Sequence, residues 1–375
     1  MTRLPRSIFS LTLVVFLSAI SVWPKSAPVK FQMTLLSLYR GSDVIFVGRY
    51  DKKEDYGTNR VADGYTVVST KTYFDVTSVL KGSPRKFVVL DDEEYRYQIE
   101  PRSGGEAPRQ AVFVQDIENF DADKQPQPGD TVLVFLKQDG DSLVLTDYRD
   151  GLKKLSPADE GIFVSRINEL NDLAGDKANG STIAAWLIRC AEQPATRWDG
   201  AHELVQGFRR LDWQQKSGPR DDEHLDPSVS AADGLDAAQA LTDQQKSALM
   251  QILLYPDFPT AGQKSPGLSD GNRELIALVK RWDPSFVVTC LIAQLRSKAL
   301  SYEANAGVMA IVSEFVADRQ VKVLARRYAD LSSLDGEAPT RTETGRSQTV
   351  ADSRARTLAT FILLANNSQT ISSQK

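Results

Sequence analysis

The chain has 375 residues, of which 41% are hydrophobic and 25% are charged, and its formal net charge is -4. This length suits two domains, because single domains run to about 100–200 residues, and the composition is that of a globular protein with a buried core. A net charge this small does not gather polyanions, so it argues against nucleic acid and an anionic membrane surface as partners.

Residues 1–24 have the pattern of a signal peptide or an N-terminal anchor. A basic start precedes an uncharged, mostly apolar run over residues 8–23, which is what the export machinery reads. The run is shorter than the roughly 20 residues of a spanning helix, and Ala19 and Ser21 provide the small side chains for cleavage after Ser21. We therefore expect an exported protein, periplasmic or secreted, with a membrane contact only if residues 8–23 remain as an inner-membrane tether.

Residues 32–165 predict a small antiparallel β-barrel domain, entered through a short helix at 33–40. Five or so short strands with turn signals between them fit a closed or partly open barrel. The clearest local feature is a hairpin about Asp139-Gly140. The expected strands cover residues 43–50, 65–80, 87–90, 111–115, 131–137 and 142–146.

An acidic run followed by alternating aromatics extends the strand at 87–90. We take it as a tentative partner surface, comprising Asp91, Asp92, Glu93, Glu94, Tyr95, Arg96 and Tyr97. Adjacent side chains of an extended chain point to opposite faces, so the four acids cannot converge on one cation. The alternative is a solvated strand end with edge-strand packing of the tyrosines. Long polar loops at 102–108 and 121–130 are a second place where partners often bind.

From residue 180 onward the hydrophobic period becomes helical. Thr242 and Gln245 form a capping box, and Asp283-Pro284 provides an N-cap with proline at the first helical position. The segments give a helical bundle or a short array of helical hairpins; a solenoid is an alternative. The expected parts are a first helical pair at 180–212, a flexible linker or long loop at 213–241, a helical domain at 242–366 and a disordered tail at 367–375.

The fold class is therefore predicted to be α+β, with a barrel followed by helices. The β part resembles the netrin-like, TIMP-like family of OB-fold domains over about residues 34–160. The matching segments are SDVIFVG at 42–48, TYFDVTSVLKG at 72–82 and PGDTVLVFL at 128–136. The resemblance implies an OB-like barrel. The family's metalloprotease inhibitors chelate the target's zinc with an amino-terminal cysteine, and no cysteine here matches it.

The sequence contains few groups for nucleophilic or metal chemistry. Its two histidines are His202, which we interpret as an exposed or partly packed helix residue, and His224, in the acidic part of the linker. Cys190 and Cys290 have apolar neighbours at helical spacing, typical of small buried side chains, and a disulfide between them is an alternative. No phosphate-binding loop, dinucleotide fingerprint or nucleophile elbow occurs. We expect no cofactor, no metal and no catalytic residues.

These observations favour a non-catalytic, extracytoplasmic interaction protein that binds a protein or glycan partner through the barrel loops. Two alternatives stay open. A hydrolase using an acidic dyad or a carboxylate-held metal requires two or more acids in one pocket with raised pKa values. A protease inhibitor follows from the family resemblance.

Overall fold

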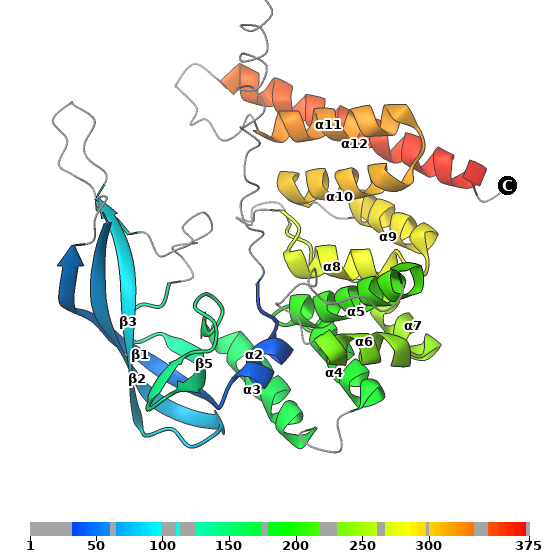
Figure 1. The fold of residues 1–375 in the computed structure, drawn as a ribbon. Helices are drawn as coiled ribbons and strands as arrows, with labels where there is room; N and C mark the ends of the chain where they lie inside the picture. The colour runs from blue at the N-terminus through cyan, green and yellow to red at the C-terminus, as the bar shows by residue number, and fades with distance from the viewer. Residues whose placement is uncertain are drawn as a thin grey trace, which may run out of the picture. The chain divides into compact units, whose positions relative to one another are not determined.

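The computed structural model describes residues 32–60, 65–98, 110–112, 125–173, 179–217, 231–260, 267–297, 300–333 and 344–372. Within these ranges the chain has an antiparallel, nearly closed barrel-like sheet followed by a helical region (Figure 1). The predicted α+β fold class is confirmed. The leader at 1–24, the loop at 102–108 and His224 lie outside the described residues.

Neighbouring strands of the sheet pair antiparallel throughout. The order is β4-β3-β2-β1-β5-β6, and β7 also pairs with β5. The predicted hairpin joins β5 to β6, and Gly140 has a φ of +57° in its turn, as glycine accommodates best. The strands are β1 Val44–Arg60, β2 Tyr65–Lys81, β3 Phe87–Gln98, β4 Gln110–Val112, β5 Thr131–Asp139, β6 Ser142–Leu145 and β7 Leu152–Lys154.

The sheet curls because β1 is long and irregular. Its pairing with β2 shifts register at four places between Ile45 and Gly57, and such bulges bend a strand and increase its twist. The curl brings β3 into contact with β6. Tyr148 Oη, from the turn after β6, donates hydrogen bonds to Asp92 Oδ1 and, at 3.0 Å, to the carbonyl of Glu93.

The first part of β1, at Ile45–Gly48, and the first part of β5, at Val132–Leu136, are buried on both faces, which explains their unbroken apolar runs. One face fills the barrel interior with Phe46, Phe74, Val88, Leu90, Val132, Val134 and Leu136. The opposite face, including Ile45, Val47, Leu133 and Phe135, packs in one core with α2 Leu35–Gly41 and α3 Pro157–Asp172. That core continues without a break into the helical region as far as Ala365.

The helical region contains nine further helices among the described residues. Two predicted starts are confirmed: Thr242 and Gln245 form the capping box of α7, and Asp283 Oδ1 accepts the Phe286 N–H at the start of α9. The helices are α4 Gly180–Glu192, α5 Arg197–Ser217, α6 Ala231–Ala240, α7 Asp243–Ile252, α8 Asp270–Val279, α9 Pro284–Ser297, α10 Tyr302–Phe315, α11 Arg319–Ser333 and α12 Thr344–Ser372.

Three predicted boundaries are wrong. The barrel domain expected at 32–165 would end inside α3, which begins at Pro157. The expected linker or long loop at 213–241 contains the end of α5 and all of α6, which packs against α4 and α5. This segment has few large apolar residues, but its small residues allow close helix contact, and Ala237 and Ala238 are buried. The expected disordered tail at 367–375 begins inside α12, which continues to Ser372.

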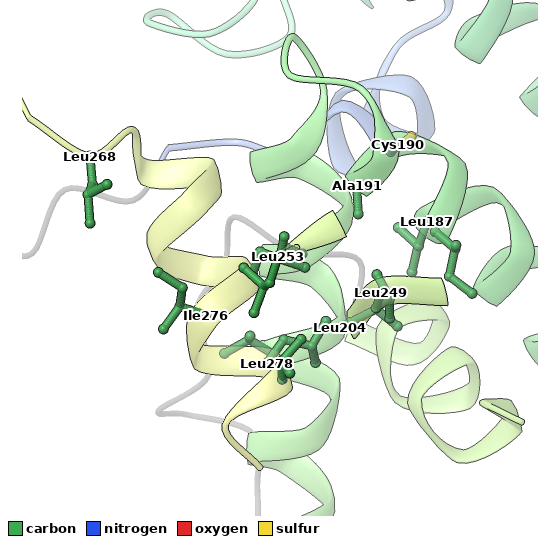
Figure 2. Close-up of a cluster of buried hydrophobic side chains, with 14 of the residues drawn as sticks. Leu187, Cys190, Ala191, Leu204, Leu249, Leu253, Leu268, Ile276 and Leu278 are labelled. Carbon is green, nitrogen blue, oxygen red and sulfur yellow. The ribbon is translucent and has the colours of Figure 1, made fainter. Parts of the chain in front are cut away.

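Helix α5 is central to the first part of the helical region, because it contacts α4, α6 and α8. Apolar side chains from these elements and α7 meet in one cluster, in which Figure 2 labels Leu187, Leu204, Leu249 and Leu278. Cys190 belongs to the same core; it and Cys290 are buried, free thiols. The interpretation of both cysteines as small buried side chains is confirmed.

Candidate functional site

Among the described residues, a cluster of aromatic, aliphatic and charged side chains lies on the outer face of β1, β2 and β3. Because successive side chains of a strand point to opposite faces, Val88 and Leu90 of β3 are buried while Phe87 and Val89 are 45% and 38% exposed. We call this cluster the outer patch. Its members are Lys52, Glu54, Tyr56, Lys71, Tyr73, Phe87, Val89 and Asp91.

Contacts between neighbouring strands organise the outer patch. Tyr73 pairs with Val89 in the β2–β3 register, and its ring centroid lies 5.9 Å from that of Phe87. Lys52 Nζ lies 4.9 Å from the centre of the Tyr73 ring. Cross-strand aromatic pairs and cations over ring faces hold such side chains in fixed positions. The result is an ordered apolar centre that remains accessible to solvent.

Charged groups surround this centre. Lys52 Nζ lies 2.6 Å from Glu54 Oε1, and Lys71 Nζ lies 3.8 Å from Asp91 Oδ1 and 4.7 Å from the centre of the Tyr56 ring. The hydrogen bond between Lys52 and Glu54 raises the pKa of the lysine and lowers that of the glutamate. Both side chains therefore stay charged over the neutral pH range.

The tentative partner surface at 91–97 is divided between the two sides of β3. Asp91 belongs to the outer patch and Glu93 is exposed, whereas Asp92 accepts the Tyr148 hydroxyl at the closing edge of the barrel. Backbone pairing places Glu94, Tyr95, Arg96 and Tyr97 opposite Val68, Val67, Thr66 and Tyr65; the side chains of 94–97 lie outside the described residues.

Sequence reasoning missed the aromatic and apolar part of the patch. A detectable indication was the run Phe87–Leu90, FVVL, in which all four residues are apolar. Because a strand alternates its faces, two of the four must point away from the barrel interior. Lys52, Tyr56 and Tyr73 had no such local indication, because the long register of β1 on β2 brings them there.

A second polar cluster is buried where the chain enters α2, and three carboxylates surround it. Asp150 Oδ2 accepts the Met33 N–H at 2.6 Å, and Asp199 Oδ1 accepts the Leu35 N–H at 2.6 Å. The Thr34 hydroxyl donates to Glu203 Oε1. Burial raises the pKa values of Asp150 and Asp199, which Lys153 partly offsets. Asp150 and Asp199 resemble the raised-pKa carboxylates that a hydrolase requires, but both accept N–H groups of the protein's own backbone.

A third polar cluster contains His202, which is 8% exposed and therefore more buried than the sequence suggested. Its ring stacks on Trp198 with centroids 4.7 Å apart, and Nδ1 lies 3.2 Å from Glu274 Oε1. Gln206 Nε2 lies 3.5 Å from His202 Nε2. The cluster ties α5 to α8. No nucleophilic side chain is among these contacts.

The structure thus defines an α+β protein with a barrel-like sheet, a helical region and an exposed outer patch. Protein-family models, curated proteins and solved structures were all compared with the chain, and none of them matches it. Across the described residues, no group of three or more His, Cys, Asp or Glu could hold a metal ion. No described helix has the length and apolar character needed to cross a membrane.

Proposed function

We propose that this protein is a non-catalytic binding protein that holds a protein partner on its outer patch. The observation that carries the proposal is that Phe87 and Val89 are exposed beside the half-buried Tyr73 ring, with charged side chains around them. An apolar, aromatic centre with a polar rim is the usual anatomy of a protein–protein interface. Binding energy in such interfaces concentrates on a few central residues.

A protein is favoured over a glycan because the apolar centre includes the aliphatic Val89 next to the rings. A sugar platform needs open ring faces with hydrogen-bonding groups beside them, whereas here Lys52 covers the face of Tyr73. The buried acids support a non-catalytic reading, since Asp150 and Asp199 both accept backbone N–H groups.

Truncating the centre of the outer patch should strongly reduce the recovery of a partner protein. The tagged full chain is recovered from a periplasmic extract, and the double variant Phe87→Ser, Val89→Thr is expected to lose at least about tenfold in captured partner. The matched control is Tyr255→Ser, which removes an 85% exposed aromatic outside the patch and should bind normally. Equal capture by the double variant, or nothing above background with the unaltered chain, would refute the proposal. Signal on a glycan array that needs Phe87 would instead favour a carbohydrate partner.

We also propose that the chain acts outside the cytoplasm. The supporting feature is the basic, then apolar N-terminal pattern at 1–24. Amino-terminal sequencing of protein from a fractionated native host should give a mature chain beginning at Val22, in the periplasmic or secreted fraction. An intact Met1 in the membrane fraction would indicate a retained tether, and an intact chain in the cytosol would contradict export.

A further inference from the structure

Helices α11 and α12 pack side by side (Figure 1). A groove of about 360 Å³ lies between them. Half-buried Leu324 and Leu364 provide apolar lining from the two helices. Val323, which lines the groove, is 55% exposed, and Leu363, the neighbour of the lining residue Leu364 on α12, is 60% exposed. The groove is lined by Arg319, Gln320, Val323, Leu324, Thr360 and Leu364.

The surface around this groove is strongly basic. Helix α11 carries four cationic side chains, Arg319, Lys322, Arg326 and Arg327, against a single acid, Asp330. All four cations are exposed, and none forms an ion pair with a residue that the structure describes. On α12, Arg356 is also exposed and uses its Nε only for the carbonyl of Asp352 in its own helix. The chain as a whole has a net charge of -4, so this concentration of positive charge is local.

We propose that the α11–α12 groove binds an acidic amphipathic helix of a partner protein. A groove between two packed helices accepts a third helix, whose apolar residues at i, i+3, i+4 and i+7 meet the floor. The 15 residues of α11 span about 22 Å, so a ligand helix of about 15 residues matches its length. Aspartate and glutamate on the flanks of that helix would pair with the arginines of α11.

Charge and shape argue against two other occupants. A second copy of the chain would place this basic surface against itself, because a two-fold contact joins identical patches, and the like charges would repel. A flat anionic bilayer would meet the protruding Val323 and Leu363 but not the half-buried Leu324 and Leu364. A helix can reach all four side chains. The proposal is independent of the outer patch, which lies on other elements.

The test uses the full chain and a fluorescein-labelled, 15-residue peptide of glutamate and leucine, with the leucines at helical spacing. Anisotropy should show binding that weakens as salt is raised. Val323→Glu, and separately the pair Arg326→Glu, Arg327→Glu, are each expected to weaken it at least tenfold. Arg85→Glu, an exposed charge reversal before β3, is the matched control and should bind normally. A peptide of equal composition with its leucines off helical spacing should bind at least tenfold more weakly.

A variant on the other helix distinguishes loss of the binding surface from misfolding of the protein. Leu363→Glu alters the other helix at an exposed site and should weaken binding like Val323→Glu, with unchanged circular dichroism. Equal affinity for the peptide with helically spaced leucines and the peptide with its leucines off that spacing would overturn the proposal. Unchanged binding by both Val323→Glu and Leu363→Glu would also overturn it. Phosphatidylglycerol vesicles and sedimentation velocity cover the other occupants. Vesicle binding or dimer formation that Val323→Glu abolishes, without peptide binding, would assign the groove to a membrane or a second copy.

Discussion

Replacement of Gly207 by alanine is expected to lower the free energy of unfolding by about 3 kcal/mol, the upper end of the usual cost of overpacking a core. A Cβ at Gly207 would lie 2.0 Å from the carbonyl oxygen of Gly234 in α6. Backbone atoms cannot rotate out of the way as a side chain can, so α5 and α6 would have to separate. That separation would also expose Ala237 and Ala238.

The matched control is Gly161→Ala in α3, where an added Cβ meets no atom within 4 Å. Alanine in an open helical position should stabilise the protein by about 0.5–1 kcal/mol. Denaturant unfolding monitored by tryptophan fluorescence compares the two variants. A Gly207→Ala protein as stable as the unaltered chain would show that α5 and α6 do not approach this closely.

The effect of removing the Asp199 carboxylate on the stability of the fold should depend on the residue that replaces it. Asp199→Ala leaves the buried Leu35 N–H without its acceptor, at an expected cost of about 1–3 kcal/mol. Asp199→Asn keeps an oxygen acceptor while removing an ionisable group from a buried site. Because burial raises the pKa of Asp199, its ionisation opposes folding at neutral pH. Asp199→Asn is therefore expected to be at least as stable as the unaltered chain at pH 7.5.

The stability of Asp199→Asn relative to the unaltered chain should depend on pH. A raised pKa in the folded state means that the carboxyl stabilises the fold below its unfolded pKa, near 4, and that this contribution is lost as pH rises through the folded value. The advantage of Asp199→Asn should accordingly shrink as the pH is lowered from 7.5 toward 4. Unfolding free energies of both proteins across this range provide the measurement. An advantage that grows on acidification would contradict the raised pKa.

Local patterns in the chain predicted the order and type of most elements. Alternation and turn residues located the strands and the β5–β6 hairpin, because these depend on neighbours a few residues apart. Capping residues likewise located the starts of α7 and α9, because Thr242 and Asp283 accept hydrogen bonds from the backbone N–H groups three residues later in the chain. Helix α6 was missed because its apolar residues are small, and only contact with α5 makes them a buried face.

Local sequence patterns therefore define the α+β class, a β part followed by a helical part, and the acidic run at 91–94, one member of which, Asp91, joins the outer patch. Which side chains meet depends on contacts between distant parts of the chain. Asp199 and Leu35 are 164 residues apart in the chain, and Thr34 and Glu203 are 169 apart. The outer patch likewise depends on three paired strands, and the α11–α12 groove on two packed helices. Such contacts depend on how distant segments pack together, which local periodicity does not specify.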